Sequence, residues 1–241
     1  MRAFIAVSTV TLRGLMGRRR ILLMLLLVAL PLLAGIAIRT GGGRANAPAI
    51  LDTLVIRTVL PLVALVVGGA TLGSEIEDGT IVYLIAKPVR RWIIALAKLV
   101  VATGSVFVLV IPAMLLTGVI VGTGGSAPLS TPLGYTLAAV AGAAAYSAVF
   151  TALGAVTSRA LVVGLAYTLI WEGVLAGLLE GTRVFSIRQA TLGLAAAITG
   201  NDLGRSVLDP TMSVAVIVIA VVGAFAVTTL ALRRSQVRAG D

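Results

Sequence analysis

Three carboxylates within four residues form the densest acidic group of the chain. Glu75, Glu77 and Asp78 lie in the segment 73–91, directly after a long apolar run. Ser74, three residues before Glu77, completes the S-x-x-E pattern of a capping box, which predicts a helix of about 12 residues beginning at Ser74. The carboxylates would then lie in its first turn, where the helix dipole favours anions. They indicate a specific polar partner, and an ordinary solvated loop helix is the alternative.

The end of this predicted helix is marked by a proline and followed by basic residues. Pro88 disfavours the helical conformation of the residue before it, so the helix should end near Lys87. Arg90 and Arg91 follow directly. The segment is therefore acidic at its beginning and basic at its end.

Glu172 is the one carboxylate inside an apolar run. An ionised carboxylate facing lipid would cost roughly 2.5 kcal/mol or more, so it must face the protein interior, a cavity or a partner. One hypothesis makes it a substrate or ion contact in a pathway, beside Tyr167 and Trp171. The other makes it a structural hydrogen bond to the following segment, for example to Arg183 or Arg188, that locks an outer gate.

Most catalytic chemistry lacks its usual residues here. The chain has no cysteine and no histidine, which excludes disulfides, thiolate metal sites, cysteine nucleophiles and the commonest general base. A nucleotide-binding P-loop needs Gly-Lys followed by Ser or Thr. Lys87 precedes Pro88 and Lys98 precedes Leu99, so neither lysine fits. We expect no catalytic residue, no metal and no bound cofactor in this chain.

The elements that carry these residues are predicted to be transmembrane helices. The 241 residues are 59% hydrophobic and 12% charged, with a mean hydropathy of +1.11. Apolar runs of this length span bilayers as helices, and the alternation of a β-barrel is absent. We expect one all-α integral membrane domain, 1–241, with six spans at 21–38, 54–73, 93–121, 133–156, 160–179 and 212–232.

Lysine and arginine in the connections predict the orientation. With the N-terminus in the cytoplasm, thirteen of the nineteen basic residues fall on the cytoplasmic side. Both termini are therefore expected inside, which an even number of spans allows. This distribution also accounts for the net charge of +10 by membrane topology, without a nucleic-acid partner.

Two segments outside the spans have patterns of their own. Residues 1–20 predict an amphipathic basic helix at the cytoplasmic interface, either a simple anchor or an elbow whose angle to the first span changes during transport. Residues 180–210 are too short and too interrupted to cross twice. They predict an outer-face helical cap or a re-entrant hairpin between spans five and six.

The order of these features resembles the permease subunits of type-2 ATP-binding-cassette exporters. The resemblance rests on Glu75-x-x-x-Gly79-Thr80, then Pro88-x-Arg90 and Lys98, and on Trp171-Glu172-Gly173 with the later arginine-containing runs at 181–183 and 186–189. It covers essentially the whole chain. It implies that 74–91 is a cytoplasmic coupling helix, with Ser74, Glu75, Glu77, Asp78, Gly79, Thr80, Pro88 and Arg90 contacting the ATPase.

The resemblance also implies partners. A separate ATPase subunit would bind ATP and Mg²⁺, and a second copy of the permease or a homologous permease would complete the usual twelve-span core. The location would be the plasma or inner membrane. Two alternatives are an ion-coupled secondary transporter that uses Glu172 and a non-transporting membrane scaffold. The substrate is not indicated.

Overall fold

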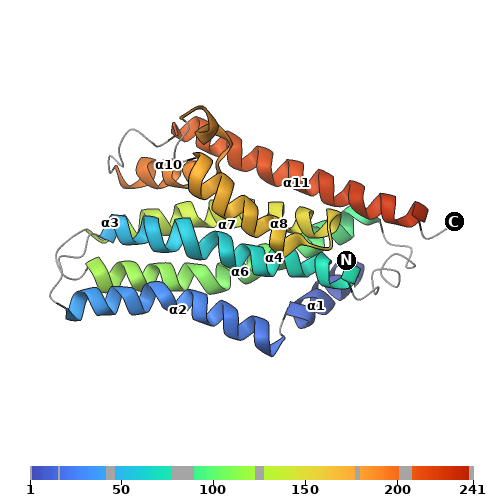
Figure 1. The fold of residues 1–241 in the computed structure, drawn as a ribbon, viewed down its shortest axis with the longest axis horizontal. Helices are drawn as coiled ribbons and strands as arrows, with labels where there is room; N and C mark the ends of the chain where they lie inside the picture. The colour runs from blue at the N-terminus through green and yellow to red at the C-terminus, as the bar shows by residue number, and fades with distance from the viewer. Residues whose placement is uncertain are drawn as a thin grey trace.

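The chain folds into a bundle of helices that run along one common direction (Figure 1). The structure is a computed structural model, and it describes residues 2–15, 17–41, 47–77, 90–122, 128–176, 180–200 and 208–238. Every element in these ranges is helical.

Five helical segments in the described residues are long and apolar enough to cross a membrane. They are α2 (Arg18–Thr40), the continuous segment Ala47–Gly73, α6 (Arg91–Gly122), α7 (Ser130–Val156) and the greater part of α11 (Pro210–Arg238). The second combines α3 (Ala47–Ile50), the π-helical segment η1 (Leu51–Val59) and most of α4 (Leu60–Glu77). The chain is therefore a multi-pass membrane protein, and these five agree with the first, second, third, fourth and sixth predicted spans.

The centre of the bundle is formed by α7 and the segment Ala47–Gly73. More than half of the most apolar window of each is buried, against 17% for α2 and α11, which lie on the outside. Small residues make this centre possible. A methyl group added at Gly68 would lie 2.9 Å from Phe150 Cβ and 3.1 Å from the Ser147 carbonyl oxygen. The α4 and α7 backbones therefore touch, as small residues allow in membrane helices.

The predicted fifth span, 160–179, is shorter than expected. The structure gives α8 (Ala160–Ala166) and the π-helical segment η2 (Tyr167–Leu175), an apolar helix too short to count among the five; residues 177–179 lie outside the described part. The apolar run is continuous in the sequence, but its outer part carries the buried Glu172. The carboxylate satisfies its hydrogen bonds against another segment instead of remaining inside a straight span.

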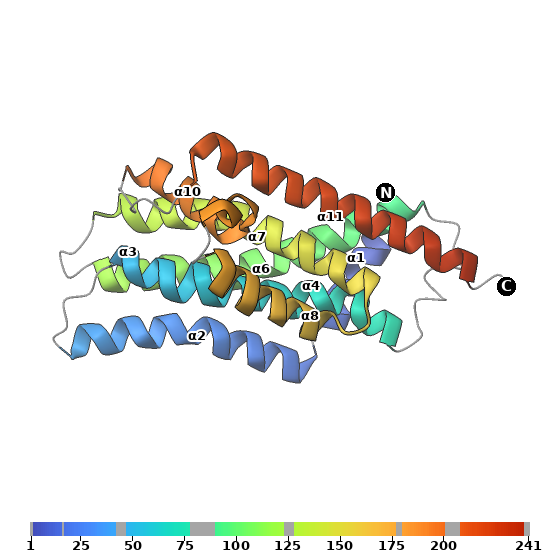
Figure 2. The same cartoon turned by 45° about the horizontal axis from the view of Figure 1, so that its top comes forward.

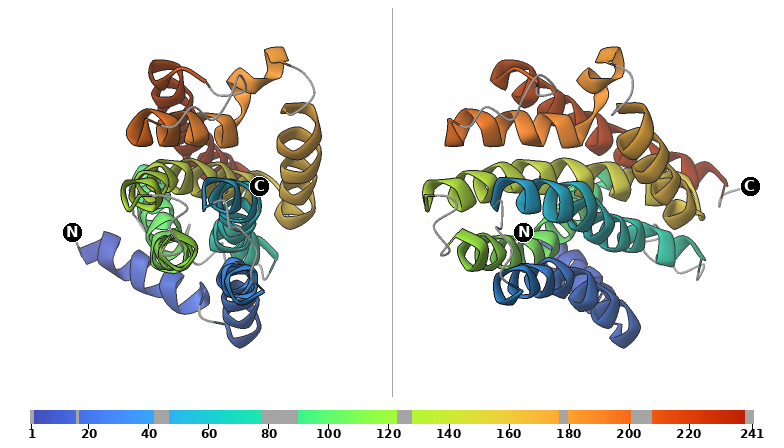
Figure 3. Two further views of the ribbon diagram at one scale, coloured as in Figure 1. Left: turned by 90° about the vertical axis from the view of Figure 1, so that its left-hand side faces the viewer. Right: turned by 60° about the vertical axis from the view of Figure 1, so that its left-hand side comes forward.

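The chain then continues through a short 3₁₀ helix, η3 (Glu180–Phe185), into α10 (Ile187–Thr199). This helix packs against α7 and α11, and Figure 2 shows it next to them at one end of the bundle; Figure 3 shows the same helices from two further sides. Methyl groups added at Gly142 and Gly134 of α7 would collide with Thr191 and Thr199. Residue numbers thus rise along α10 as they fall along α7, so the two helices are antiparallel.

The N-terminal segment forms α1 (Arg2–Leu15), which ends before α2 begins at Arg18. It packs against α6 and α4, with Leu15 buried and Arg13 exposed, as its amphipathic pattern predicts. Figure 1 shows α1 at an angle to α2 and at the same end of the bundle as the C-terminal end of α11.

The predicted start of the loop helix is wrong. α4 runs without interruption to Glu77, so Ser74, Glu75 and Glu77 are its last residues, and Ser74 is not the N-cap of a new helix. Adding residues to an existing helix is cheaper than nucleating another, and glutamate is a good helix former. The capping-box pattern is therefore overridden by the helix that precedes it.

Candidate functional site

Glu172 is the centre of a buried polar cluster and is only 2% exposed. The Tyr167 hydroxyl donates to its Oε1 at 2.9 Å, and the N–H of Ile187 donates to the same oxygen at 2.9 Å. The Ser186 hydroxyl donates a short hydrogen bond to Oε2. Both carboxylate oxygens therefore have donors, which is how a buried charge avoids a large desolvation cost.

Two of these donors belong to the beginning of α10. Ser186 is the N-cap of that helix, and its Oγ accepts from the N–H of Gln189 at 3.1 Å. Glu172 takes the N–H of Ile187, another of the four that no carbonyl within the helix can reach. An anion at a helix N-terminus is also favoured by the helix dipole. The carboxylate thus joins η2 to α10 and completes the cap.

The third donor depends on the π-helical geometry of η2. Tyr167 and Glu172 are five residues apart, which places them about 140° apart on an α-helix at 100° per residue. The wider turn of η2 brings them to one side. Tyr167 also packs edge-on against Phe150 of α7, with ring centroids 6.2 Å apart, and Phe150 stacks on Tyr146 at 5.9 Å. These aromatic contacts hold the Tyr167 ring in place.

Arg188 adds a cation to the cluster. Its side chain is 5% exposed and lies within electrostatic range of Glu172, Asp52 and Arg57. Its Nε atom has no hydrogen-bond partner among the described residues. The Tyr146 hydroxyl is also fully buried and lies within electrostatic range of both Glu172 and Arg188. Charges from η1, η2 and α10 therefore meet around α7.

The η1 side of the cluster carries an ion pair. Arg57 Nη2 lies 3.0 Å from Asp52 Oδ2, and Arg57 Nε donates to both carboxylate oxygens at 3.1 Å. This pair again spans five residues of a π-helical segment. With Glu172 and Arg188, the two acids and two arginines balance one another in charge.

The cluster can bind polar groups, but its serine is not placed for nucleophilic chemistry. Ser186 is fully buried, and its oxygen is occupied between Glu172 and the N–H of Gln189. The hydroxyl therefore serves as a helix cap. The arrangement holds together the place where two short helices meet inside the bundle.

The structure brings together only some of the residues proposed for a pathway or gate. Tyr167 and Glu172 are in direct contact, and Arg188 lies close by. Trp171 is half-buried on η2. Arg183 lies on η3, where its carbonyl oxygen accepts from the N–H of Ser186 at 3.1 Å. The donors that tie Glu172 to the following segment are Ser186 and the Ile187 amide, not the two arginines suggested as examples.

The proposed coupling residues are covered only in part. Ser74, Glu75 and Glu77 lie on the end of α4, whereas Asp78, Gly79, Thr80 and Pro88 fall outside the described residues. Arg90 is exposed just before α6, and its carbonyl oxygen accepts from the N–H of Ile93 at 2.9 Å.

Lys98, the eighth residue of α6, is completely buried. Its Nζ donates to the carbonyl oxygen of Thr71 at 2.5 Å, which joins α6 to the last turns of α4. The Thr71 hydroxyl in turn donates to the Gly68 carbonyl oxygen at 2.6 Å. The two helices that flank the segment 78–89 are therefore fastened to each other.

Sequence reasoning missed Ser186, Asp52 and Tyr146. Ser186-x-x-Gln189 is a capping-box pattern, which marks Ser186 as an N-cap and the following residues as a helix. Arg57 alone would be expected to extend towards the headgroups, as a long cationic side chain does. The pairing of Arg57 with Asp52 needs the π-helical turn of η1, and no sequence pattern predicts that turn. Tyr146 lies in a run of small apolar residues and nothing marks it.

No family model matches the chain, and a search of curated proteins gives no match.

Proposed function

We propose that this chain is the membrane-embedded permease subunit of an ATP-driven exporter. A separate ATPase would bind ATP and Mg²⁺ and would dock on the segment 74–91. The proposal rests on the resemblance of the sequence and on one structural observation, the bond from Lys98 to the Thr71 carbonyl oxygen. Lys98 of α6 is bonded to Thr71 of α4, so a force applied to the segment between these two helices would move both of them together.

The topology in this proposal has six crossings. Five are the long apolar helices. The remaining crossing, the fifth in chain order, would consist of two halves, α8 with η2 and then α10. α7 runs the length of the bundle, and a crossing that follows it must run in the opposite direction. The antiparallel packing of α10 on α7 meets this requirement and so supports the path. Both termini would then lie in the cytoplasm, and α1 would serve as the elbow helix at the membrane surface.

The assembly would contain two permeases and two ATPase subunits in the plasma or inner membrane. A second copy of this chain or a homologous permease would complete the pathway. Hydrolysis would move the ATPases, and the spans would open alternately to each side. The Glu172 cluster would then hold α10, the outer half of the fifth crossing, in position.

The chain contains no cysteine, so one introduced cysteine can carry a cross-linker at a single known site. We would attach a cross-linker to Gly79→Cys in intact producing cells and identify the product by mass spectrometry. The expected product is a protein with a nucleotide-binding P-loop, whose ATP hydrolysis is measured after co-purification. Glu75→Lys in the same background should reduce the yield of this product, since it reverses a charge at the docking segment.

The matched control is Leu129→Cys, because Leu129 is exposed directly before α7, and α7 begins at the end of the bundle opposite to α1 (Figure 1). It should give no ATPase product. Equal capture from Leu129→Cys, or the absence of an ATPase product from Gly79→Cys, contradicts the proposal. Asp209→Lys is the control for charge reversal, because Asp209 is exposed just before α11.

The alternative of an ion-coupled transporter would use Glu172 as the cation or proton site. Three donors already occupy this carboxylate, so it is stabilised without a transported cation. This favours the structural role. Transport driven by an ion gradient in the absence of any ATPase would reverse the preference, and a non-transporting scaffold would show neither activity.

A further inference from the structure

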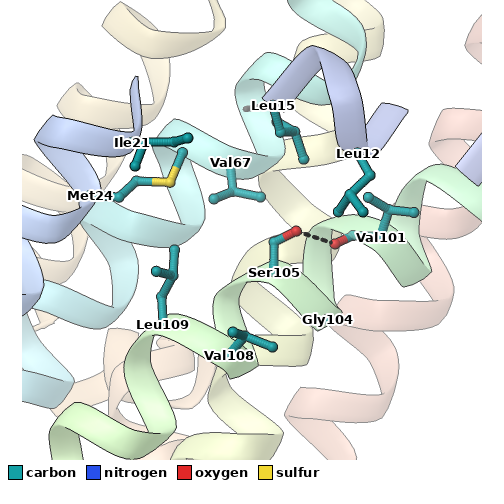
Figure 4. Close-up of a pocket in the computed structure, with 10 residues that line it drawn as sticks. All are labelled: Leu12, Leu15, Ile21, Met24, Val67, Val101, Gly104, Ser105, Val108 and Leu109. Carbon is teal, nitrogen blue, oxygen red and sulfur yellow. Dashed lines mark hydrogen bonds between the residues drawn. The ribbon is translucent and has the colours of Figure 1, made fainter. Parts of the chain in front are cut away.

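A second site lies away from the Glu172 cluster, between α1, α2, α4 and α6. It is a cavity of about 560 Å³, within the range of roughly 300–1,000 Å³ that is usual for small-molecule sites. Figure 4 shows its walls, to which Leu15 of α1, Met24 of α2, Val67 of α4 and Leu109 of α6 contribute. Because Leu12 and Leu15 of α1 line it, the cavity lies at the end of the bundle where α1 is found.

The lining offers an occupant almost no hydrogen bond. Ser105 is the one polar side chain among the lining residues, and its hydroxyl donates to the Val101 carbonyl oxygen of its own helix at 2.8 Å. Gly104 leaves the wall open, because a methyl group added there would meet nothing within 4 Å. A cavity of this size with apolar walls, opening from transmembrane helices, suits a hydrocarbon chain.

Basic residues stand beside the cavity. Arg13, Arg18 and Arg19 are exposed, and Arg20 is partly buried. They flank the lining residues at the junction of α1 and α2: Arg13 follows Leu12, and Arg20 precedes Ile21. None of the four forms an ion pair within the part of the chain that the structure describes. Arg20 does donate to the backbone carbonyl oxygen of Gly14 at 3.4 Å, which leaves its charge in place. An apolar cavity beside these four cations is complementary to a molecule with a hydrocarbon chain and an anionic head.

We propose that this cavity binds one anionic phospholipid, with an acyl chain between α1 and α6 and its phosphate at the arginines of the α1–α2 junction. The site fixes α1 against the bundle, since Leu12 and Leu15 of α1 form one of its walls. Basic residues next to a membrane span attract anionic lipid headgroups electrostatically. The proposal concerns a resident lipid and holds whatever the chain transports.

The test is native mass spectrometry of the full chain in detergent, titrated with phosphatidylglycerol and, separately, with phosphatidylcholine of the same acyl chains. We expect one phosphatidylglycerol to bind before all others. Gly104→Leu fills the cavity and should weaken both lipids at this site by about tenfold. Gly223→Leu is the matched control, because Gly223 is exposed on α11 and also faces open space. It should bind like the unaltered chain.

A second pair of variants tests the headgroup. Arg19→Gln with Arg20→Gln should weaken phosphatidylglycerol by about fivefold for each arginine and leave phosphatidylcholine unchanged. Arg233→Gln with Arg234→Gln removes the same charge from the exposed end of α11 and should change neither lipid.

Each contrary result overturns the proposal. If Gly104→Leu binds phosphatidylglycerol like the unaltered chain, the acyl chain does not occupy the cavity. If both glycine variants or both arginine pairs weaken binding equally, the lipid is held by the general surface. Arg19 is exposed and Arg20 is only partly buried, so the arginine variants keep the test decisive even if Gly104→Leu does not fold.

Discussion

The hydroxyl of Tyr167 donates to Glu172 Oε1 at 2.9 Å across five residues of one helical segment. An α-helix would point these side chains to different faces, and the π-helical turn of η2 brings them together. The same spacing recurs in η1, where Arg57 pairs with Asp52. Both departures from α-helical geometry thus coincide with a pair of polar side chains five residues apart.

Removing the carboxylate should destabilise the protein substantially. Glu172→Ala leaves the Tyr167 and Ser186 hydroxyls and the Ile187 amide without their acceptor in a buried site. We expect the free energy of unfolding to fall by about 2–5 kcal/mol. Reversible unfolding in detergent measures this change. Tyr167→Phe removes one hydrogen bond and should cost about 1 kcal/mol.

The two changes should not be additive. A double-mutant cycle between Tyr167→Phe and Glu172→Ala should give a coupling of about 0.5–3 kcal/mol, because the residues contact each other. A coupling of zero would mean that the hydrogen bond contributes nothing. Asp209→Asn is the surface control and should change stability by no more than about 0.5 kcal/mol.

Two neighbouring glycines of α4 should respond differently to alanine. At Gly68 the added methyl meets the α7 backbone at 3.1 Å, so the helices must separate, and we expect a loss of about 1–3 kcal/mol. At Gly69 the nearest atom is 3.7 Å away. Gly69→Ala should be neutral or stabilising by up to about 1 kcal/mol through helix propensity. Equal effects at the two positions would disprove the close contact of α4 and α7.

The buried ammonium of Lys98 should contribute to stability. Lys98→Met keeps the length of the side chain but removes the donor to Thr71, so we expect a loss of about 1–3 kcal/mol in thermal unfolding. Hydrogen exchange should also increase at the end of α4. Arg90→Met removes an exposed cation nearby and is expected to leave both measurements unchanged.

The orientation can be tested with single cysteines in the cysteine-free chain. Arg90 directly precedes α6, and Leu129 directly precedes α7, the next long helix of the chain. In a spanning bundle these two positions lie on opposite sides of the membrane. With the proposed orientation, a membrane-impermeant maleimide should label Leu129→Cys in intact cells and Arg90→Cys only after the inner face is exposed. The opposite pattern would invert the topology, and labelling of both in intact cells would rule out a spanning bundle.

Hydropathy predicts most of the fold because each long span is apolar in itself. The first predicted span, 21–38, becomes 18–40, and the third, 93–121, becomes 91–122. The fifth is shorter than predicted, ending as a described helix at Ala160–Leu175. One carboxylate barely changes the average hydropathy over a window, yet Glu172 decides how the chain runs there. Its acceptors are satisfied by Ser186 and Ile187, which lie beyond the run, and no window over the run can include them.

The candidate site was predictable only in its centre. The cost of a charge in lipid singles out Glu172, whereas its contact with Tyr167 depends on the π-helical turn of η2. The Asp52–Arg57 pair and the position of Tyr146 depend on π-helical turns and on the packing of α7 against other helices. Such features belong to the tertiary structure, so the sequence alone does not specify them.

The shortness of α10 has a consequence for biogenesis. Its 13 residues extend about 20 Å at 1.5 Å per residue, too little to cross a hydrocarbon core of about 30 Å. It is buried between α7 and α11, and α11 is synthesised after it. A nascent chain that ends before Pro210 should leave residues 187–199 open to protease, whereas a chain that includes α11 should protect them. This part of the bundle therefore closes only after α11 has been synthesised.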